Sequence, residues 1–302
     1  MSSIVPSRTK RAAIGRTDLT AYLFVGPAAL IIVAFSFVAI AISLWVSLRH
    51  WDVVAETSTY VGLANYKRAL FDRDSLFRLA LLNTGWYVAM AAPCTLATSF
   101  ILALMANRLK GTTSALVKTI YFLPSITPAV IVSLVWFQLY DAFRLMTASW
   151  GHEINLLGST SLAMPAIALM AVWQGSGYNM VIFLAGLGDI PQDFYDAASV
   201  DGAGRVRQLW HVTIPLLRNT IVFVTVMLVI GAFQVFTSVY IITQGGPANS
   251  TEVMASVIFR NAFQATGQTG YACAMAWLMF GVVLVFVLRS EERRVGKECR
   301  SR

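Results

Sequence analysis

Long apolar stretches separated by short polar segments dominate this sequence. Six intervals contain no Lys, Arg, Asp or Glu, and each can hold the roughly 20 apolar residues that a membrane-spanning helix needs. After their polar ends are trimmed, the pattern predicts six helices, with cores at residues 21–48, 80–106, 119–140, 162–187, 218–242 and 271–288. The predicted fold class is therefore an all-α membrane protein with six transmembrane helices in a domain of residues 19–288.

The longest patterned polar segment, residues 189–215, lies between the fourth and fifth predicted spans. Pro191 suits the first turn of a helix, because its missing N–H would be unpaired there. Gly202 suits the end of that helix. Ala197 and Ala198 leave the helix with a face of small side chains, which lets another protein's backbone approach closely. The segment predicts either a docking helix or a plain loop without a partner.

Composition supports the membrane assignment. The chain has 302 residues, of which 57% are hydrophobic and only 13% are charged, whereas a soluble domain carries roughly 25% charged residues. Cys94, Cys273 and Cys299 are scattered, so neither a disulfide framework nor a thiolate metal site is expected. The net charge of +8 does not by itself indicate nucleic-acid binding, because basic loops commonly set the orientation of a membrane protein.

The basic residues favour a cytoplasmic N-terminus, with residues 1–18 as a cytoplasmic segment. Ten lie on the side of the N-terminus, the second loop and the 189–215 segment: Arg8, Lys10, Arg11, Arg16, Arg108, Lys110, Lys118, Arg205, Arg207 and Arg218. Seven lie on the other side: Arg49, Lys67, Arg68, Arg73, Arg78, Arg144 and Arg260.

The last fourteen residues differ from the rest of the chain. Residues 289–302 read RSEERRVGKECRSR and follow an apolar helix abruptly. This string resembles the translation of a sequencing-library adapter, so we expect residues 289–302 to be a non-native artefact and leave them out of fold reasoning.

The 189–215 segment resembles the EAA loop of the inner-membrane permeases of binding-protein-dependent ABC importers. That pattern is Glu-Ala-Ala, three residues, Gly, nine residues and Ile-x-Leu-Pro, and the spacing here matches at every point, with Asp196, Val212 and Ile214 as conservative departures. The resemblance implies a cytoplasmic coupling loop at 189–215 that meets ATPase subunits. The implied coupling residues are Asp196, Ala197, Ala198, Asp201, Gly202 and Pro215.

Three outer motifs are similar to the sugar-importing and glycerol-phosphate-importing branch of the same family. They are VGLANY at residues 61–66, Asn83-Thr84, and TQGGPANSTE at residues 243–252. The resemblance implies a transport subunit, not an enzyme, in a bacterial plasma membrane. It also implies a carbohydrate-like solute and three kinds of partner: a second homologous permease, two ATP-binding subunits and an extracytoplasmic solute-binding protein. ATP and Mg²⁺ would sit on the partner subunits, and this chain would bind no cofactor, metal or nucleic acid.

Polar and aromatic residues inside the spans are candidates for a solute pathway, because such residues tend to face a cavity. Amide groups and aromatic faces suit the hydroxyls and C–H faces of a neutral polyol. The alternative role is to hold helices together. The candidates are Trp173, Gln174, Tyr178, Asn179 and Gln234. No span has a charged residue at its centre, which argues against a proton relay.

Two other function classes stay open from the residues alone. The sequence has no Gly-x-x-x-x-Gly-Lys-Ser/Thr loop for ATP, so an ATP-independent secondary transporter or channel is the main alternative. An intramembrane aspartyl protease is a remote one. Its Gly-x-Gly-Asp would be residues 186–189, and its Tyr-Asp would be Tyr140-Asp141 or Tyr195-Asp196.

Overall fold

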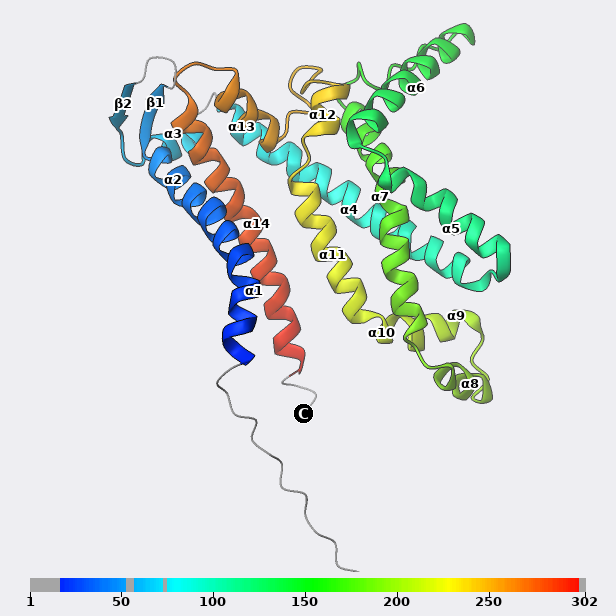
Figure 1. The fold of residues 1–302 in the computed structure, drawn as a ribbon. Coiled ribbons are helices and arrows are strands. Elements are labelled where there is room, and N and C mark those ends of the chain that lie inside the picture. The colour runs from blue at the N-terminus through cyan, green and yellow to red at the C-terminus, as the bar shows by residue number, and fades with distance from the viewer. Residues whose placement is uncertain (1–16, 53–56, 73–74, 299–302) are drawn as a thin grey trace, which may run out of the picture.

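The computed structural model describes residues 17–52, 57–72 and 75–298. α2, α7, α11 and α14 run between two ends of the molecule, α4 and α5 cross it obliquely, and α6 projects outward (Figure 1). The hairpin end carries β1, β2, α3, α12 and α13, and the α8 end carries α8, α9 and α10. The elements are α1 (Thr17–Ile32), η1 (Val33–Phe37), α2 (Val38–Ser47), β1 (Arg49–Asp52), β2 (Thr57–Tyr60), α3 (Ala64–Phe71), α4 (Leu76–Arg108), α5 (Gly111–Ile126), α6 (Ala129–Ser149), α7 (Ala163–Gly188), α8 (Gln192–Val200), α9 (Arg205–Gln208), η2 (Leu209–Thr213), α10 (Ile214–Leu216), α11 (Arg218–Phe233), α12 (Thr237–Ile242), α13 (Met254–Phe263) and α14 (Thr269–Glu298).

Within the part of the chain that the structure describes, six helical segments are long and apolar enough to cross a membrane, which confirms the predicted fold class. Five of them agree with the predicted spans to within a few residues. These five are Tyr22–Ser47, Leu76–Arg108, Ala163–Gly188, Arg218–Ile242 and Thr269–Arg289. The first is continuous through α1, η1 and α2, where η1 is a π-helical segment.

The third span was predicted wrongly as one helix over 119–140. The chain instead forms α5, breaks at Thr127 and Pro128, and continues as α6. Thr127 is extended (φ −76°, ψ 133°), as expected for a residue before proline, because the proline ring disfavours the helical conformation there. The apolar span that begins after the break is Ala129–Ser149.

The fifth span is also interrupted, although its predicted limits are right. α11 ends at Phe233, and three residues separate it from α12. Gln234 follows α11 with φ −93° and ψ 12°, and its N–H donates to the carbonyl of Gly231 at 3.2 Å. The candidate pathway residue Gln234 therefore lies in a helix break near the hairpin end.

A small β-hairpin was not predicted. β1 and β2 pair antiparallel, with Arg49 opposite Tyr60 and Asp52 opposite Thr57. The VGLANY motif follows it directly and fixes it to α2. The side-chain amide of buried Asn65 donates to the carbonyls of Ser47 and Arg49, both at 2.9 Å.

α4 and α7 form the centre of the molecule (Figure 1). In the α7 span 44% of the most apolar window is buried, against 6% in the first span, so α7 is the helix enclosed by neighbours and the first span is peripheral. α5 approaches α7 closely at Gly177, where a Cβ would overlap the carbonyl of Tyr121. Only glycine permits this contact between the two backbones.

The structure does not describe the first and last residues of the chain. Residues 1–16 of the predicted cytoplasmic segment lie outside the described residues. α14 continues past Arg289 to Glu298, and residues 299–302 lie outside the described part. The assignment of residues 289–302 as non-native stays a prediction.

Candidate functional site

The loop between α7 and α11 begins with α8, which closes in a hydrogen-bonded turn at Gly202. The N–H of Gly202 donates to the carbonyl of Ser199 at 3.0 Å, and the N–H of Ala203 donates to the carbonyl of Ala198 at 2.9 Å. These two bonds form a Schellman motif, whose C′ position requires a left-handed backbone. Gly202 has φ +73° and a Cβ there would meet nothing within 4 Å, so backbone conformation alone selects glycine.

Side-chain hydrogen bonds hold α8 against the chain that follows it. The Nε2 of Gln208 donates to Ser199 Oγ at 2.9 Å and to the carbonyl of Ala203 at 3.1 Å. The hydroxyls of Tyr195 and Thr213 lie 3.1 Å apart. Thr213 is buried, so this contact joins α8 to the interior at the base of α11. The loop is therefore a folded unit.

The outer surface of this unit is apolar at several points. Val200 is 89% exposed, Val206 71% and Trp210 64%. Ala197 is exposed beside them, whereas Ala198 is half-buried. We call Ala197, Val200, Val206 and Trp210 the α8-end surface. Exposed apolar side chains on a loop between spans are the kind of group that a protein partner can cover.

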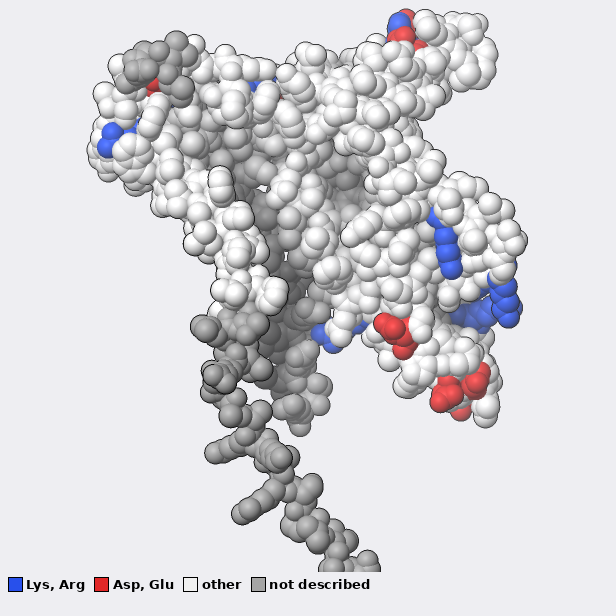
Figure 2. Space-filling view, in the orientation of Figure 1, with Lys and Arg blue, Asp and Glu red and all other residues white. Residues whose placement is uncertain are grey.

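Charged side chains surround this surface. Asp196 and Asp201 are exposed on and just after α8, and the Nε2 of Gln192 donates to Asp196 Oδ1 at 3.2 Å. In Figure 2, acidic side chains lie over α8 and basic side chains lie over α5 and the turn before it, while much of the remaining face is uncharged. A polar rim around apolar side chains is the usual anatomy of a protein interface.

Pro215, the last residue of the EAA-like pattern, is exposed and lies in the short helix α10. It follows the π-helical segment η2. Proline has no N–H to donate to the carbonyl one turn earlier, and irregular helical geometry is common where that bond is missing. The loop thus joins α11 through an irregular connection.

A second candidate site is a hollow of about 290 Å³ between α4, α7 and α11. We call it the central hollow. Tyr178 and Asn179 from α7 line it, together with Tyr87 and Thr95 from α4. Asn179 is buried and its Nδ2 donates to the carbonyl of Gly175 at 2.8 Å. No charged residue is among those that line this hollow, so its chemistry suits a neutral ligand.

The structure separates the other pathway candidates from the central hollow. Gln174 holds the α5–α6 break: its Nε2 donates to the carbonyl of Thr127 at 3.2 Å, and its own carbonyl accepts from Ser125 Oγ at 2.7 Å. Trp173 lies against Trp136 with ring centroids 5.6 Å apart, in a different hollow. Gln234 is adjacent to Val235, which does line the central hollow.

The loop at residues 243–253 is anchored at the hairpin end by the Asn83-Thr84 motif. The Nδ2 of Asn83 donates to the carbonyls of Asn249 at 2.9 Å and Glu252 at 3.0 Å. Thr84 Oγ1 accepts from the N–H of Met254 at 3.1 Å. These contacts fix a loop far away in sequence onto α4.

A buried carboxylate stabilises the same loop. Glu252 is fully buried, accepts a 2.5 Å hydrogen bond from Ser256 Oγ, and forms an ion pair with Arg260. A buried charge needs such partners because desolvation is costly. The sequence pattern did not single out Gln208, Tyr87 or Thr95, and it gave Glu252, Arg260 and Tyr195 none of the contacts described here. Glu252 could have been noticed as an acidic residue immediately before an apolar helix.

The carboxylates required for an aspartyl protease do not form a pair within a membrane span. Asp141 lies in α6 and its Oδ1 pairs with Arg144 at 2.8 Å, whereas Asp189 caps the C-terminus of α7 at the α8 end. Asp196 lies outside the spans, on α8. Two carboxylates must be close to share a proton, so the protease alternative has no support. Among the described residues, no group of three or more His, Cys, Asp or Glu is placed to hold a metal ion.

Comparison with known sequences identifies one family. Residues 96–297 match the family model described as binding-protein-dependent transport system inner membrane component. The probable ABC transporter permease protein YesP of Bacillus subtilis is 34% identical over 288 residues, covering 92% of this chain and 91% of the relative. The trehalose/maltose transport system permease protein MalF of Thermococcus litoralis is 28% identical over 272 residues (88% and 90%). The sn-glycerol-3-phosphate transport system permease protein UgpA of Yersinia pestis is 31% identical over 286 residues (91% and 94%).

Solved structures share the fold. A chain of a bacterial ABC transporter that imports the acidic polysaccharide alginate superposes with a TM-score of 0.80 at 21% identity, covering 93% of this chain and 97% of that one. A second structure, of a bacterial alginate ABC transporter in complex with a pentasaccharide-bound periplasmic protein, superposes with a TM-score of 0.76 at 20% identity, covering 93% and 96%.

Proposed function

This chain belongs to the family of binding-protein-dependent transport system inner membrane components, and we propose that it is one of two permease subunits of an ATP-driven importer for a carbohydrate-like solute. The family makes it a multi-pass transport subunit of the inner membrane. The proposal adds its partners: a second homologous permease, two ATP-binding subunits that carry ATP and Mg²⁺, and an extracytoplasmic solute-binding protein.

The α8-end surface is the proposed contact with an ATP-binding subunit, and this exposed, folded loop is the single observation that carries the proposal. In this loop Ala197, Val200 and Trp210 are exposed, and a bound partner would bury them. The Schellman turn at Gly202 and the Gln208 hydrogen bonds make the loop a unit that can transmit force. Tyr195 contacts Thr213 at the end of η2, and the carbonyl of Thr213 accepts from the N–H of Leu217 directly before α11. Movement of a bound partner would therefore reach the span that lines the central hollow.

This assignment also sets the orientation of the chain. The α8 end, with residues 1–18, would face the cytoplasm, and the hairpin end would face the binding protein. Asp196, Ala198, Asp201 and Pro215 would act as coupling residues within the loop. Asn83 and Glu252 would hold the 243–253 loop in the shape that meets the binding protein.

The central hollow is the proposed part of the solute pathway that this chain contributes. Its aromatic and amide groups, including Tyr178 and Asn179, can stack on a sugar ring and bond its hydroxyls. The trehalose/maltose relative supports a sugar. The glycerol-phosphate relative fits less well, because no charged residue lines the hollow to pair with a phosphate.

Reconstitution tests the proposal against an ATP-independent carrier. Proteoliposomes would contain either this chain alone, or this chain with its second permease, ATP-binding subunits and binding protein. We expect uptake of a neutral saccharide only by the full assembly and only with ATP. Uptake by the chain alone without ATP would instead establish the secondary-transporter alternative.

A further inference from the structure

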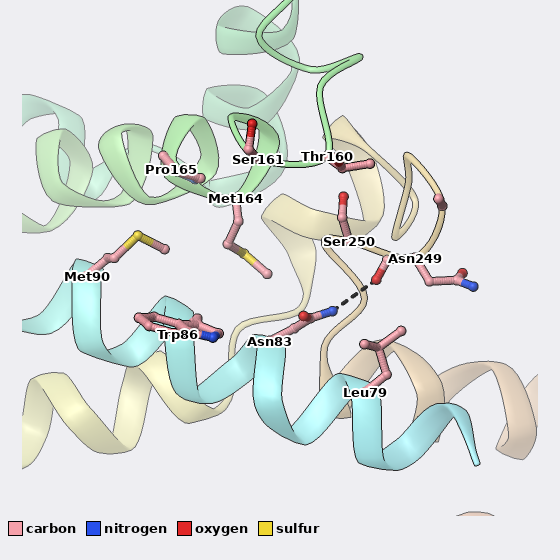
Figure 3. Close-up of a pocket in the computed structure, with 11 residues that line it drawn as sticks. Leu79, Asn83, Trp86, Met90, Thr160, Ser161, Met164, Pro165, Asn249 and Ser250 are labelled. Atoms are coloured by element: carbon pink, nitrogen blue, oxygen red, sulfur yellow. Dashed lines mark hydrogen bonds between the residues drawn. The ribbon is translucent and has the colours of Figure 1, made fainter. Parts of the chain in front are cut away.

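A second hollow lies nearer the hairpin end than the central hollow. Its volume is about 500 Å³, within the range of roughly 300–1,000 Å³ that is usual for small-ligand sites. It lies between α4, the start of α7 and the 243–253 loop (Figure 3). We call it the hairpin-end hollow. Its lining residues are Leu79, Asn83, Trp86, Met90, Thr160, Ser161, Met164, Pro165, Ala248, Asn249 and Ser250.

One aromatic face dominates this hollow. Trp86 is 67% exposed, and its ring lies below Met164 in Figure 3. A tryptophan held open in a hollow gives the apolar C–H face of a sugar ring a flat surface to stack on. Trp86 is also a large apolar side chain whose burial by a ligand would be favourable.

Polar side chains also line this hollow, and Asn83 lies next to Trp86 on α4 (Figure 3). The Nδ2 of Asn83 donates to the carbonyls of Asn249 and Glu252. Its Oδ1 can therefore accept a hydrogen bond from a ligand. Figure 3 shows that this oxygen lies on the side of Asn83 that faces Trp86. Ser250 Oγ has no hydrogen-bond partner among the described residues, but it is shielded from solvent, so Asn83 Oδ1 is the better placed acceptor for a ligand hydroxyl.

The lining contains no charged residue. This excludes the ion pairs that would select a phosphate or a carboxylate. Thr160 and Ser161 are exposed residues of the same lining, and the Ser161 hydroxyl lies 3.1 Å from that of Ser159. The chemistry is that of a polyol site: one ring face, several hydroxyls and an amide oxygen.

The position of the hollow relates it to the proposed pathway. Along α4 the hairpin-end hollow uses Leu79 to Met90 and the central hollow uses Tyr87 to Thr95. Along α7 the lining moves from Met164 to Asn179 in the same direction. The hairpin-end hollow and the central hollow therefore follow one another along α4 and α7, and the hairpin-end hollow is the one next to the 243–253 loop.

We propose that the hairpin-end hollow is an outer subsite, in which Trp86 stacks on a ring of a neutral saccharide while Asn83 accepts a hydrogen bond from one of its hydroxyls, before the solute reaches the central hollow. This inference rests on the proposed import function and names an additional binding site for it. Trp86 is the specificity-determining residue, because stacking favours a ring over an open-chain polyol.

A cysteine-protection experiment tests occupancy of the subsite. Ser161→Cys, in the assembled importer without its binding protein, would be labelled with a membrane-impermeant maleimide at rising concentrations of maltose, lactose or mannitol. We expect maltose or lactose to slow labelling at least several-fold and mannitol to have little effect. Ser149→Cys is the matched control, because Ser149 is exposed on α6 outside this hollow, and its labelling should not change. The importer without an added cysteine gives the background.

Transport by Trp86 variants separates failure of the subsite from failure of the import function. Trp86→Ala should raise the KM for saccharide uptake about tenfold, and Trp86→Phe should restore most of the affinity. Trp150→Ala is the control, since Trp150 is 70% exposed and lies outside this hollow. Normal uptake by Trp86→Ala together with unprotected Ser161→Cys would overturn the subsite alone. Absence of saccharide uptake by the wild-type importer would overturn the proposed function and the subsite together. Protection by phospholipid headgroups rather than by saccharides would identify a lipid site and contradict the inference.

Discussion

The backbone N–H of Ala203 donates to the carbonyl of Ala198 at 2.9 Å, so α8 ends in a closed turn directly beside the exposed Ala197 and Val200. This turn exists because Gly202 adopts φ +73°. The surface proposed to meet the ATP-binding subunit therefore has its shape set by one glycine.

Replacing Gly202 should weaken coupling without removing the protein from the membrane. Gly202→Ala forces a side chain into the left-handed region, at a cost of about 1–3 kcal/mol. We expect lower co-purification of the ATP-binding subunit and lower ATP-driven uptake. Gly202→Asn should retain more of both, since asparagine tolerates this conformation. Gly204→Ala is the matched control, because Gly204 has φ −68° and open space around it.

A charge in the α8-end surface should block docking and leave folding intact. Val200 is 89% exposed, so Val200→Asp removes no interior contact and places an unpaired charge in the proposed interface. Pull-down of the ATP-binding subunit should fall at least tenfold, with unchanged thermal unfolding of the isolated chain. Phe263→Asp is the comparison, because Phe263 is 79% exposed at the hairpin end. If both variants retain the subunit equally, the docking surface lies elsewhere.

Loss of the Gln208 amide should loosen α8. Gln208→Leu removes the hydrogen bonds to Ser199 and Ala203, each contributing about 0.5–1.5 kcal/mol. Hydrogen exchange at the amides of Gly202 and Ala203 should become several-fold faster. Gln192→Leu removes a hydrogen bond to the exposed Asp196 and should leave those two amides unchanged. Equal exchange in both variants would show that Gln208 does not hold the loop.

Removal of the Asn83 amide should impair the response to the binding protein. Asn83→Ala breaks two hydrogen bonds that hold the 243–253 loop on α4, leaving the partner carbonyls to water or unpaired. We expect weaker stimulation of ATP hydrolysis by the solute-loaded binding protein, while basal hydrolysis stays normal. Asn219→Ala, at the exposed base of α11, is the control. If the binding protein stimulates ATP hydrolysis equally in Asn83→Ala and wild type, the 243–253 loop does not take part in the response to the binding protein.

The central hollow gives a prediction about the solute. Tyr178→Ala should raise the KM for saccharide uptake, because Tyr178 supplies an aromatic wall to the hollow. Phe223→Ala is the control, since Phe223 is a half-exposed aromatic residue on α11 that does not line it. If Tyr178→Ala and Phe223→Ala have the same KM for saccharide uptake, the central hollow is not part of the solute pathway.

Much of the fold could be predicted because membrane spans depend on composition. The span of α7 was placed to within one residue, since its limits are set by where apolar residues begin and end. The break at Thr127 and Pro128 was missed although the two prolines of LPSITP signalled it. The hairpin was missed because a four-residue strand such as β1 carries too little pattern to separate it from a loop.

The sites show a similar division. Gly202 could be assigned from sequence because its role is local: it ends a helix. The Nε2 of Gln174 donates to the carbonyl of Thr127, 47 residues away. This contact could not be predicted, because the partner exists only once α5 and α7 are packed, and the pathway role of Gln174 stays a prediction. Gln208 and Asn83 likewise act through contacts that sequence spacing does not encode.

Site-specific cross-linking from Ala197 tests the central claim most directly. Ala197→Cys, bearing a short photoreactive group, would be illuminated in membranes that carry the assembled importer and still take up solute. We expect a cross-link to an ATP-binding subunit, which is reduced in the Val200→Asp background and absent when the group is placed at Phe263→Cys. A preparation that transports solute but gives no cross-link from Ala197 to an ATP-hydrolysing partner would contradict it.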